Sequence, residues 1–146
     1  MMKQYVMLMP VLIWSGCIIA ISCMESWLKF RAPGVTLPVG LGIGKLVFNA
    51  LNKMEWVFAL IIAVAWFLNK QQVDSSFLIL FGLAVCILIM QTFWLLPTLD
   101  ARANEVISGK TLPASSLHWY FIGGEVIKLG SLVILGFRLF KGFVVG

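Results

Sequence analysis

Residues 77–97 read FLILFGLAVCILIMQTFWLLP, a run of 21 positions without a charged side chain. A helix that crosses a bilayer needs about 20 mostly apolar residues, so this run predicts a membrane-spanning helix. Residues 5–23 form a second charge-free run, of 19 positions. We expect this run to be a retained span and not a cleaved signal peptide, because it is long for a signal core and Ser22-Cys23-Met24-Glu25 is a poor cleavage site.

The composition of the whole chain also indicates a membrane protein. The 146 residues are 61% hydrophobic and 12% charged, with a mean hydropathy of +1.01. An ordinary soluble domain carries about 25% charged residues, so this chain has too few to cover a soluble surface. The composition therefore excludes most soluble, disordered and nucleic-acid-binding classes. The formal net charge of +5 is more naturally explained by charges that flank membrane spans than by a nucleic-acid surface.

Two further spans carry charges in their N-terminal halves. The apolar run 56–68 has only 13 residues and becomes long enough when it extends back through residues 46–54. The last span, residues 117–139, contains Glu125 and Lys128. Because backbone groups within lipid must be hydrogen-bonded internally, we predict an all-α fold, a four-helix integral membrane bundle that forms a single domain over residues 1–146. The spans lie at approximately 5–24, 46–68, 77–97 and 117–139.

The connections between these spans differ in length. Residues 25–44 contain two prolines and four glycines, which predicts a partly structured re-entrant or interfacial connection. Residues 69–76 form a short polar turn, so spans two and three should be antiparallel neighbours. Residues 98–116 predict a longer polar loop. With four spans, both termini lie on one side of the membrane and the two longer connections lie on the other.

Polar side chains gather at the starts of spans two and four. Lys45, Asn49, Asn52 and Glu55 follow one another at intervals of four and three, which places them on one helix face. A carboxylate alone in hydrocarbon is costly, so we expect pairing of Glu125 with Lys128, of Glu25 with Lys29, and of Glu55 with a lysine from another helix. The predicted polar cluster consists of Lys45, Asn49, Glu55, His118, Glu125 and Lys128.

Some of the charged residues near the spans have a simpler, non-functional explanation. Lys29, Arg31, Arg102 and Lys110 are better explained as interfacial charges that reach the headgroups. Glu55 and Glu125 have two possible roles. Each can belong to a structural ion pair that sets the helix register, or to a functional site, and both interpretations stay open. Basic residues outside the spans are divided about equally between the two sides, so they do not decide the orientation.

Short motifs along most of the chain resemble the transmembrane protein 205 family and its bacterial relatives. They are Trp14-Ser15-Gly16, residues 28–33 (LKFRAP), residues 42–48 (GIGKLVF), residues 94–97 (WLLP) and Leu117-His118. This resemblance implies a four-helix membrane bundle with an export-like role and supplies no catalytic residues. Residues 27–30 (WLKF) and Glu55 also resemble, more weakly, the DoxX-like four-helix membrane proteins.

The sequence favours small-molecule transport or a membrane accessory role. A membrane-embedded enzyme acting on small lipophilic substrates and a structural subunit of a larger membrane complex stay open as alternatives. No nucleophile motif is recognisable, so the pattern leans against an enzyme. With three cysteines and one histidine, we expect no metal and no cofactor. The expected partner is the lipid bilayer, in the inner or plasma membrane of a cell, with no nucleic acid. A homo-oligomer or a membrane partner subunit stays open.

Overall fold

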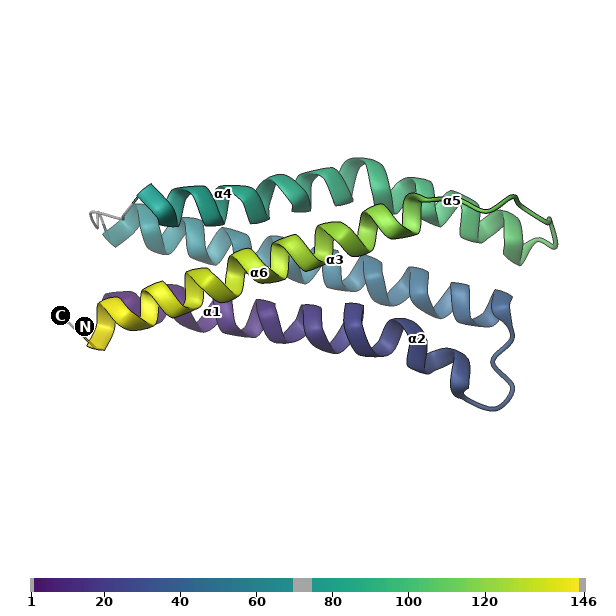
Figure 1. Ribbon diagram of the computed structural model, residues 1–146, viewed down its shortest axis with the longest axis horizontal. Helices are drawn as coiled ribbons and strands as arrows, with labels where there is room; N and C mark the ends of the chain where they lie inside the picture. Colours follow the sequence, from purple (N-terminus) through teal and green to yellow (C-terminus); the bar gives the residue numbers. More distant parts are fainter. Residues whose placement is uncertain (1, 70–74, 145–146) are drawn as a thin grey trace.

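The computed structural model describes residues 2–69 and 75–144. Four long apolar helical segments pack side by side as an all-α bundle, which confirms the predicted fold (Figure 1). By length and composition each can cross a membrane, and they are Val6–Arg31, Leu37–Leu68, Ser75–Ile107 and Leu117–Gly142. The protein is therefore a four-span membrane protein.

The first span consists of one long helix followed by three shorter helical segments. Helix α1 (Met2–Ile18) continues through a π-helix, η1 (Ile19–Glu25), into α2 (Ser26–Leu28) and the 3-10 turn η2 (Lys29–Arg31). The second span is one helix, α3 (Leu37–Asn69). The third consists of α4 (Ser75–Met90), the π-helix η3 (Gln91–Leu95) and α5 (Leu96–Ile107), and the fourth is α6 (Leu117–Val144).

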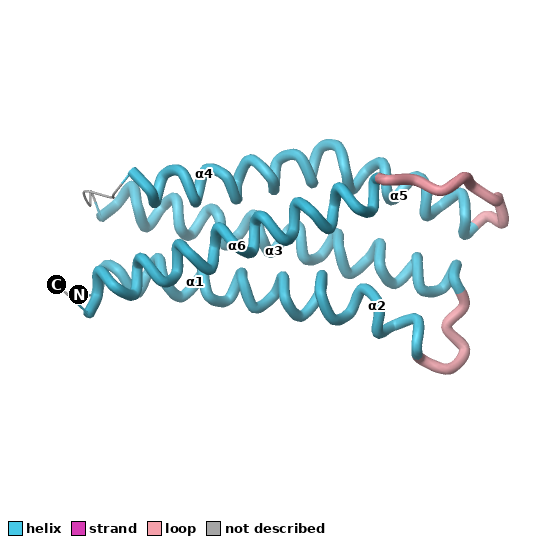
Figure 2. The backbone as a smooth tube through the Cα atoms, in the orientation of Figure 1, coloured by secondary structure: helices cyan, strands magenta, loops and turns pink. Residues whose placement is uncertain are grey.

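The connections are shorter than the sequence predicted. Only residues 32–36 separate η2 from α3, so the expected connection over residues 25–44 is largely helical. The expected polar loop over residues 98–116 is also wrong in its first half, because helix α5 continues to Ile107 (Figure 2). Both remaining turns use a glycine with positive φ, Gly34 at 81° and Gly109 at 90°, a conformation that costs glycine little. The predicted turn at residues 69–76 falls mostly outside the described residues.

Two glycines of the second span explain why the helix can begin so early. A Cβ atom on Gly40 would overlap the ring of Phe30, and one on Gly44 would lie 2.7 Å from Lys29 Nζ. Glycine usually weakens a helix. Here its missing side chain lets the end of the first span pack directly against the start of α3, and this packing stabilises the helix.

The helices form a closed four-membered arrangement. Helix α6 packs against α1 and α4, α1 also packs against α3, and α3 packs against α5. The contact between α3 and α5 confirms that spans two and three are neighbours. One end of the bundle holds the starts of α1 and α4 and the ends of α3 and α6, and the other holds the two connections that residues 32–36 and 108–116 form (Figure 1). We call the latter the loop end.

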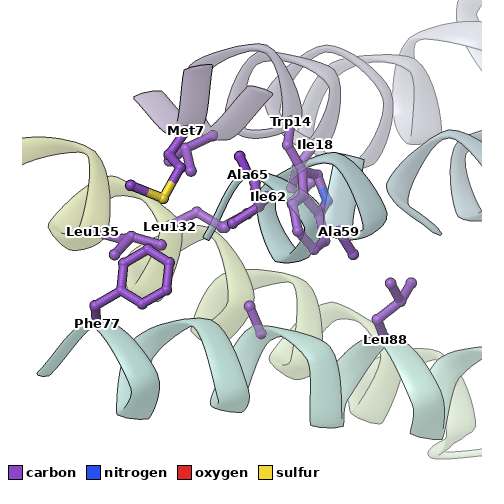
Figure 3. Close-up of a cluster of buried hydrophobic side chains, with 12 residues drawn as sticks. Met7, Trp14, Ile18, Ala59, Ile62, Ala65, Phe77, Leu88, Leu132 and Leu135 are labelled. Atoms are coloured by element: carbon purple, nitrogen blue, oxygen red, sulfur yellow. The ribbon is translucent and has the colours of Figure 1, made fainter. Parts of the chain in front are cut away.

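An apolar core fills the half of the bundle away from the loop end. Trp14 and Ile18 of α1 and Leu132 of α6 have no exposed surface. They belong to a cluster with members from every span (Figure 3): Met7, Val11, Trp14, Ile18, Ala59, Ile62, Ala65, Phe77, Ala84, Leu88, Leu132 and Leu135. A smaller cluster of Leu95, Leu96 and Phe121 lies nearer the loop end. The polar side chains described below come from helix turns between these two clusters.

Candidate functional site

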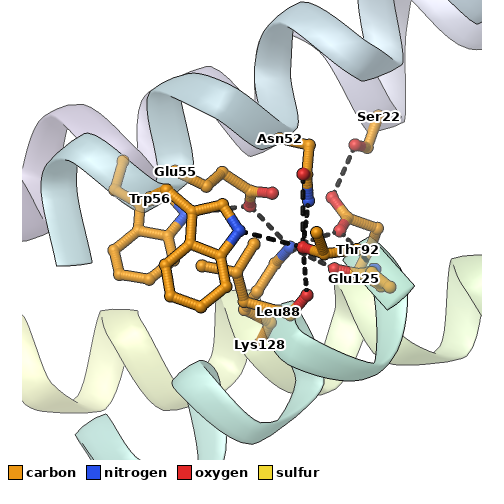
Figure 4. A network of polar contacts seen from close by, with 10 residues as sticks. Ser22, Asn52, Glu55, Trp56, Leu88, Thr92, Glu125 and Lys128 are labelled. Atoms are coloured by element: carbon orange, nitrogen blue, oxygen red, sulfur yellow. Dashed lines mark hydrogen bonds and ion pairs between the residues drawn. The ribbon is translucent and has the colours of Figure 1, made fainter. Parts of the chain in front are cut away.

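A buried lysine stands at the middle of a polar centre between the helices. Lys128 of α6 is fully buried, and its Nζ lies 2.5 Å from Glu55 Oε1 and 2.6 Å from Glu125 Oε1. The same Nζ donates a hydrogen bond of 2.6 Å to Gln91 Oε1. We call Glu55, Gln91, Glu125 and Lys128 the polar centre (Figure 4).

Neutral donors from other spans complete the polar centre. Trp14 Nε1 donates to Glu55 Oε1 at 2.8 Å, and Gln91 Nε2 donates to Glu125 Oε1 at 2.7 Å. The hydroxyl of Ser22 donates to Glu125 Oε2 at 2.6 Å. The four members of the centre come from three spans, and Trp14 and Ser22 add the first span, so the centre depends on the assembled bundle.

The two π-helices each supply one of these donors. Ser22 lies in η1 and Gln91 in η3. A π-helix carries one extra residue in a turn, which shifts the side chains after it around the helix axis, and such turns are frequent at functional sites. Here both π-helices occur at the level of the polar centre, where an ordinary α-helical run would have presented different side chains.

A second, uncharged network adjoins the polar centre. Thr92 Oγ1 accepts hydrogen bonds from Asn52 Nδ2 at 3.0 Å and from Trp56 Nε1 at 2.9 Å, and donates to the carbonyl of Leu88 at 2.7 Å (Figure 4). This network joins α3 to the third span. It accounts for two polar residues, Asn52 and Thr92, within otherwise apolar surroundings.

The outer surface at this level is apolar. Val57 and Val126, close in sequence to Glu55 and Glu125, are 55% and 63% exposed, and Phe93, two residues after Gln91, is 75% exposed. An outward-facing apolar band of this kind matches the hydrocarbon of a bilayer. The charges of the polar centre therefore lie inside the part of the bundle that lipid surrounds.

A cavity of about 410 Å³ opens between the helices at the loop end. Apolar side chains from all four spans form much of its wall, among them Phe30, Phe48, Leu99 and Phe121. Four charged side chains also line it, and these are Lys29, Lys45, Asp100 and Arg102, with His118 as a further polar group. The lining therefore combines an apolar wall with an excess of positive charge.

Lys29, Lys45 and Arg102 each make one ion pair or hydrogen bond, and Lys29 Nζ also lies 5.5 Å and 5.4 Å from the ring centroids of Phe30 and Phe48. Lys29 Nζ lies 3.3 Å from Glu25 Oε2, and Lys45 Nζ donates to Asn104 Oδ1 at 2.9 Å. Arg102 donates to the carbonyl of Pro113 at 2.6 Å. Since an ammonium has three donors and a guanidinium five, these single contacts leave capacity for a ligand.

A smaller cavity, of about 60 Å³, lies between the loop-end cavity and the polar centre. Phe48, His118 and Phe121 line both cavities, whereas Ser22 and Glu125 line only the smaller one. The two cavities thus share part of their lining, and the smaller one reaches one carboxylate of the polar centre. The apolar core lies on the other side of that centre.

The structure divides the predicted polar cluster into two groups and leaves Asn49 outside both. Glu55, Glu125 and Lys128 meet in the polar centre, and the three expected ion pairs, including that of Glu25 with Lys29, are confirmed. Lys45 and His118 instead line the loop-end cavity. Asn49 donates a hydrogen bond of 2.8 Å to Asp100 Oδ2, so it joins α3 to α5.

The sequence interpretation missed Gln91, Trp14 and Ser22, which bind the charged groups of the site. Gln91 is 1% exposed and contacts both charged residues of α6. Its signal was available, because Gln91 and Thr92 are the most polar side chains in the run 77–97. Trp14 gave no such signal, since an indole in an apolar span is equally typical of core packing.

Among residues 2–69 and 75–144, no group of three or more histidine, cysteine or acidic side chains is placed to hold a metal ion. Comparisons of the chain with protein-family models, with curated proteins and with solved structures give no match. The four-span bundle, its polar centre and its loop-end cavity are therefore the basis for any functional argument.

Proposed function

We propose that the protein binds a small amphipathic anion in the loop-end cavity and transports it, as a multi-pass protein of an inner or plasma membrane. The single observation that carries this proposal is the cavity itself, whose volume of about 410 Å³ falls within the range of about 300–1,000 Å³ typical of small-molecule sites. The export-like role implied by the resemblance to the transmembrane protein 205 family points in the same direction.

The lining supports an anion with an apolar body. Phe30, Phe48 and Phe121 offer aromatic surface for the apolar part. Lys45 and Arg102 offer charged donors for the head group, and Asp100 on the same wall already accepts a hydrogen bond from Asn49. Charge-assisted hydrogen bonds to a carboxylate or phosphate are stronger than neutral ones, so the positive excess favours an anionic head group.

The position of the cavity supports transport over a purely structural role. It lies at one end of the spans, and the smaller cavity extends it toward the polar centre. A ligand entering at the loop end would therefore approach the interior of the bundle. A structural subunit has no need of a cavity with a charged lining.

A matched ligand series tests the binding step. Octanoate, octanol and octylamine share one apolar chain and differ in head-group charge. For the protein in lipid nanodiscs, we expect saturable calorimetric binding of octanoate, weaker binding of octanol and none of octylamine. Lys45→Gln and Arg102→Gln should each weaken octanoate binding several-fold, whereas Lys110→Gln, an exposed lysine outside the lining, should not.

Uptake of labelled octanoate into proteoliposomes then tests transport, with the Lys45→Gln variant as the comparison. Equal binding of all three ligands, or octanoate binding that the Lys45→Gln and Arg102→Gln substitutions leave unchanged, would overturn the proposed site. Binding without uptake would refute the transport step and would indicate that the protein only binds the anion, as an accessory protein.

A further inference from the structure

The polar centre contains more acidic groups than basic ones. Glu55 and Glu125 both contact the single ammonium of Lys128. All three side chains are nearly or fully buried, with exposures of 2%, 4% and 0%. If both carboxylates were ionised, the centre would carry a net charge of −1 in the part of the bundle that lipid surrounds.

Lys128 is the positively charged member. Its ammonium has three hydrogens, and its Nζ has three acceptors within 2.6 Å, namely Glu55 Oε1, Glu125 Oε1 and Gln91 Oε1. A neutral amine could not donate to all three. The ammonium therefore balances one carboxylate and leaves the other unbalanced.

The surrounding helices supply no second cation among the described residues. The α1 and η1 segments face the centre with Trp14 and Ser22, η3 with Gln91, and α6 with Glu125 and Lys128 themselves. On α3, the nearest lysine in sequence, Lys53, lies on the exposed side of the helix. The neutral groups can donate hydrogen bonds, but they cannot cancel a whole charge.

An unbalanced buried charge in a membrane protein is costly and is normally paired or neutralised. We infer that the polar centre holds one exchangeable proton, carried by Glu55, which makes the centre electrically neutral. This inference concerns a site other than the loop-end cavity and stands independently of the proposed ligand.

The hydrogen bonds indicate which carboxyl group carries the proton. Glu125 accepts on both oxygens, from Lys128 and Gln91 on Oε1 and from Ser22 on Oε2. Contacts of this kind stabilise the ionised form. For Glu55, the contacts within the described chain, from Lys128 and Trp14, both fall on Oε1, so its Oε2 is the oxygen left to bind a proton.

The two cavities supply the route for exchange. Glu125 and Ser22 line the smaller cavity, and His118 lines both cavities. Water at the loop end can therefore approach Glu125, and Lys128 Nζ contacts both carboxyl groups. The proton of Glu55 leaves when Lys128 gives one of its own protons to Glu125 and takes the proton of Glu55 in its place; Glu125 then releases its proton to water in the smaller cavity. On the opposite side, the apolar core offers no comparable polar path in the described residues, so the proton exchanges with the loop end.

Infrared spectroscopy tests the inference directly, because only a protonated carboxyl group shows the C=O stretching band of a carboxylic acid. The protein is measured at neutral pH in a detergent without ester groups. We expect the wild type to show this band and to shift it to lower frequency in D2O. The Glu25→Gln variant, which removes a carboxylate outside the polar centre, is the matched control and should keep the band.

Variants of the polar centre give a pattern that a merely structural ion pair would not produce. Glu55→Gln should lose the band. Glu125→Gln should lose it too, although Glu55 is still present, because Lys128 then balances Glu55 in its ionised form. Lys128→Met should strengthen the band, because both carboxyl groups are then neutral.

Four results would overturn the inference. They are a wild type without the band, a Glu55→Gln variant that keeps it, a Glu125→Gln variant that keeps it, and a band that does not shift in D2O. Because Lys128→Met removes the central residue and can impair folding, the decision rests on the wild type and the two milder glutamine variants, each first shown to be helical and monodisperse.

Discussion

At the scale of single residues, the polar centre connects all four spans through a few side chains. Gln91 is the clearest example, because it donates to Glu125 and accepts from Lys128 at the same time. A neutral amide between two charged groups satisfies both without adding charge. Gln91 is 1% exposed, so its hydrogen bonds are shielded from water.

We predict that Gln91→Leu destabilises the protein through these two lost hydrogen bonds. Leaving a buried partner unsatisfied costs about 1–3 kcal/mol, so the thermal unfolding temperature in detergent should fall clearly. The neighbouring substitution Phe93→Leu changes a side chain that is 75% exposed and should alter stability by less than about 0.5 kcal/mol. Equal unfolding temperatures for Gln91→Leu and the wild type would show that the amide is not needed.

At the scale of elements, glycines in α3 allow the end of the first span to pack closely against that helix. The start of α3 contains Gly40, Gly42 and Gly44, of which Gly40 and Gly44 have side chains of the first span where a Cβ would lie. A Cβ added at Gly42 would have Ile107 Cδ1 as its nearest neighbour, at 4.0 Å, which is an ordinary contact. An added methyl group would therefore clash with the first span at Gly40 and Gly44 but fit without a clash at Gly42.

We predict opposite effects for two alanine substitutions in this helix. Gly42→Ala should raise the thermal unfolding temperature, because alanine is a better helix former than glycine by about 1 kcal/mol. Gly40→Ala should lower it, because the new methyl group displaces the ring of Phe30, and octanoate binding should weaken because Phe30 and Gly40 line the cavity. A rise in unfolding temperature for both variants would contradict the close packing of the first span on α3.

At the scale of the whole molecule, the arrangement of the helices separates two ends with different chemistry. The loop end holds the cavity with its charged lining, and the apolar core fills the half of the bundle toward the other end. The beginning of α1 and the end of α6 lie together at this second end (Figure 1). With four spans, the chain returns to the side on which it started.

We therefore predict that reporters fused before Met1 and after Gly146 report the same compartment. A reporter inserted at Gly109, in the turn after α5, should report the opposite one. Fluorescence of a folded green fluorescent protein and activity of alkaline phosphatase distinguish the cytoplasmic from the external side. Opposite signals from the two termini would refute the four-span arrangement.

The sequence by itself determined the all-α membrane bundle and the number of its spans. Long charge-free runs can only be accommodated in lipid as helices, so residues 5–23 and 77–97 leave little choice. Helical spacing and the cost of burying a charge also predicted that Glu125 pairs with Lys128 and that Glu55 pairs with a lysine of another helix, and both are confirmed.

Only the tertiary structure decided how far the helices extend and which side chains form the site. The glycine-rich residues 37–44 were predicted to be part of a loop, because glycine disfavours helices when nothing packs against it. In the structure they begin α3, and Phe30 and Lys29 pack against Gly40 and Gly44. The π-helices at Ser22 and Gln91 shift the helix register by an amount that an ideal period does not anticipate. The polar centre and the loop-end cavity depend on distances between helices far apart in sequence, which local patterns do not encode.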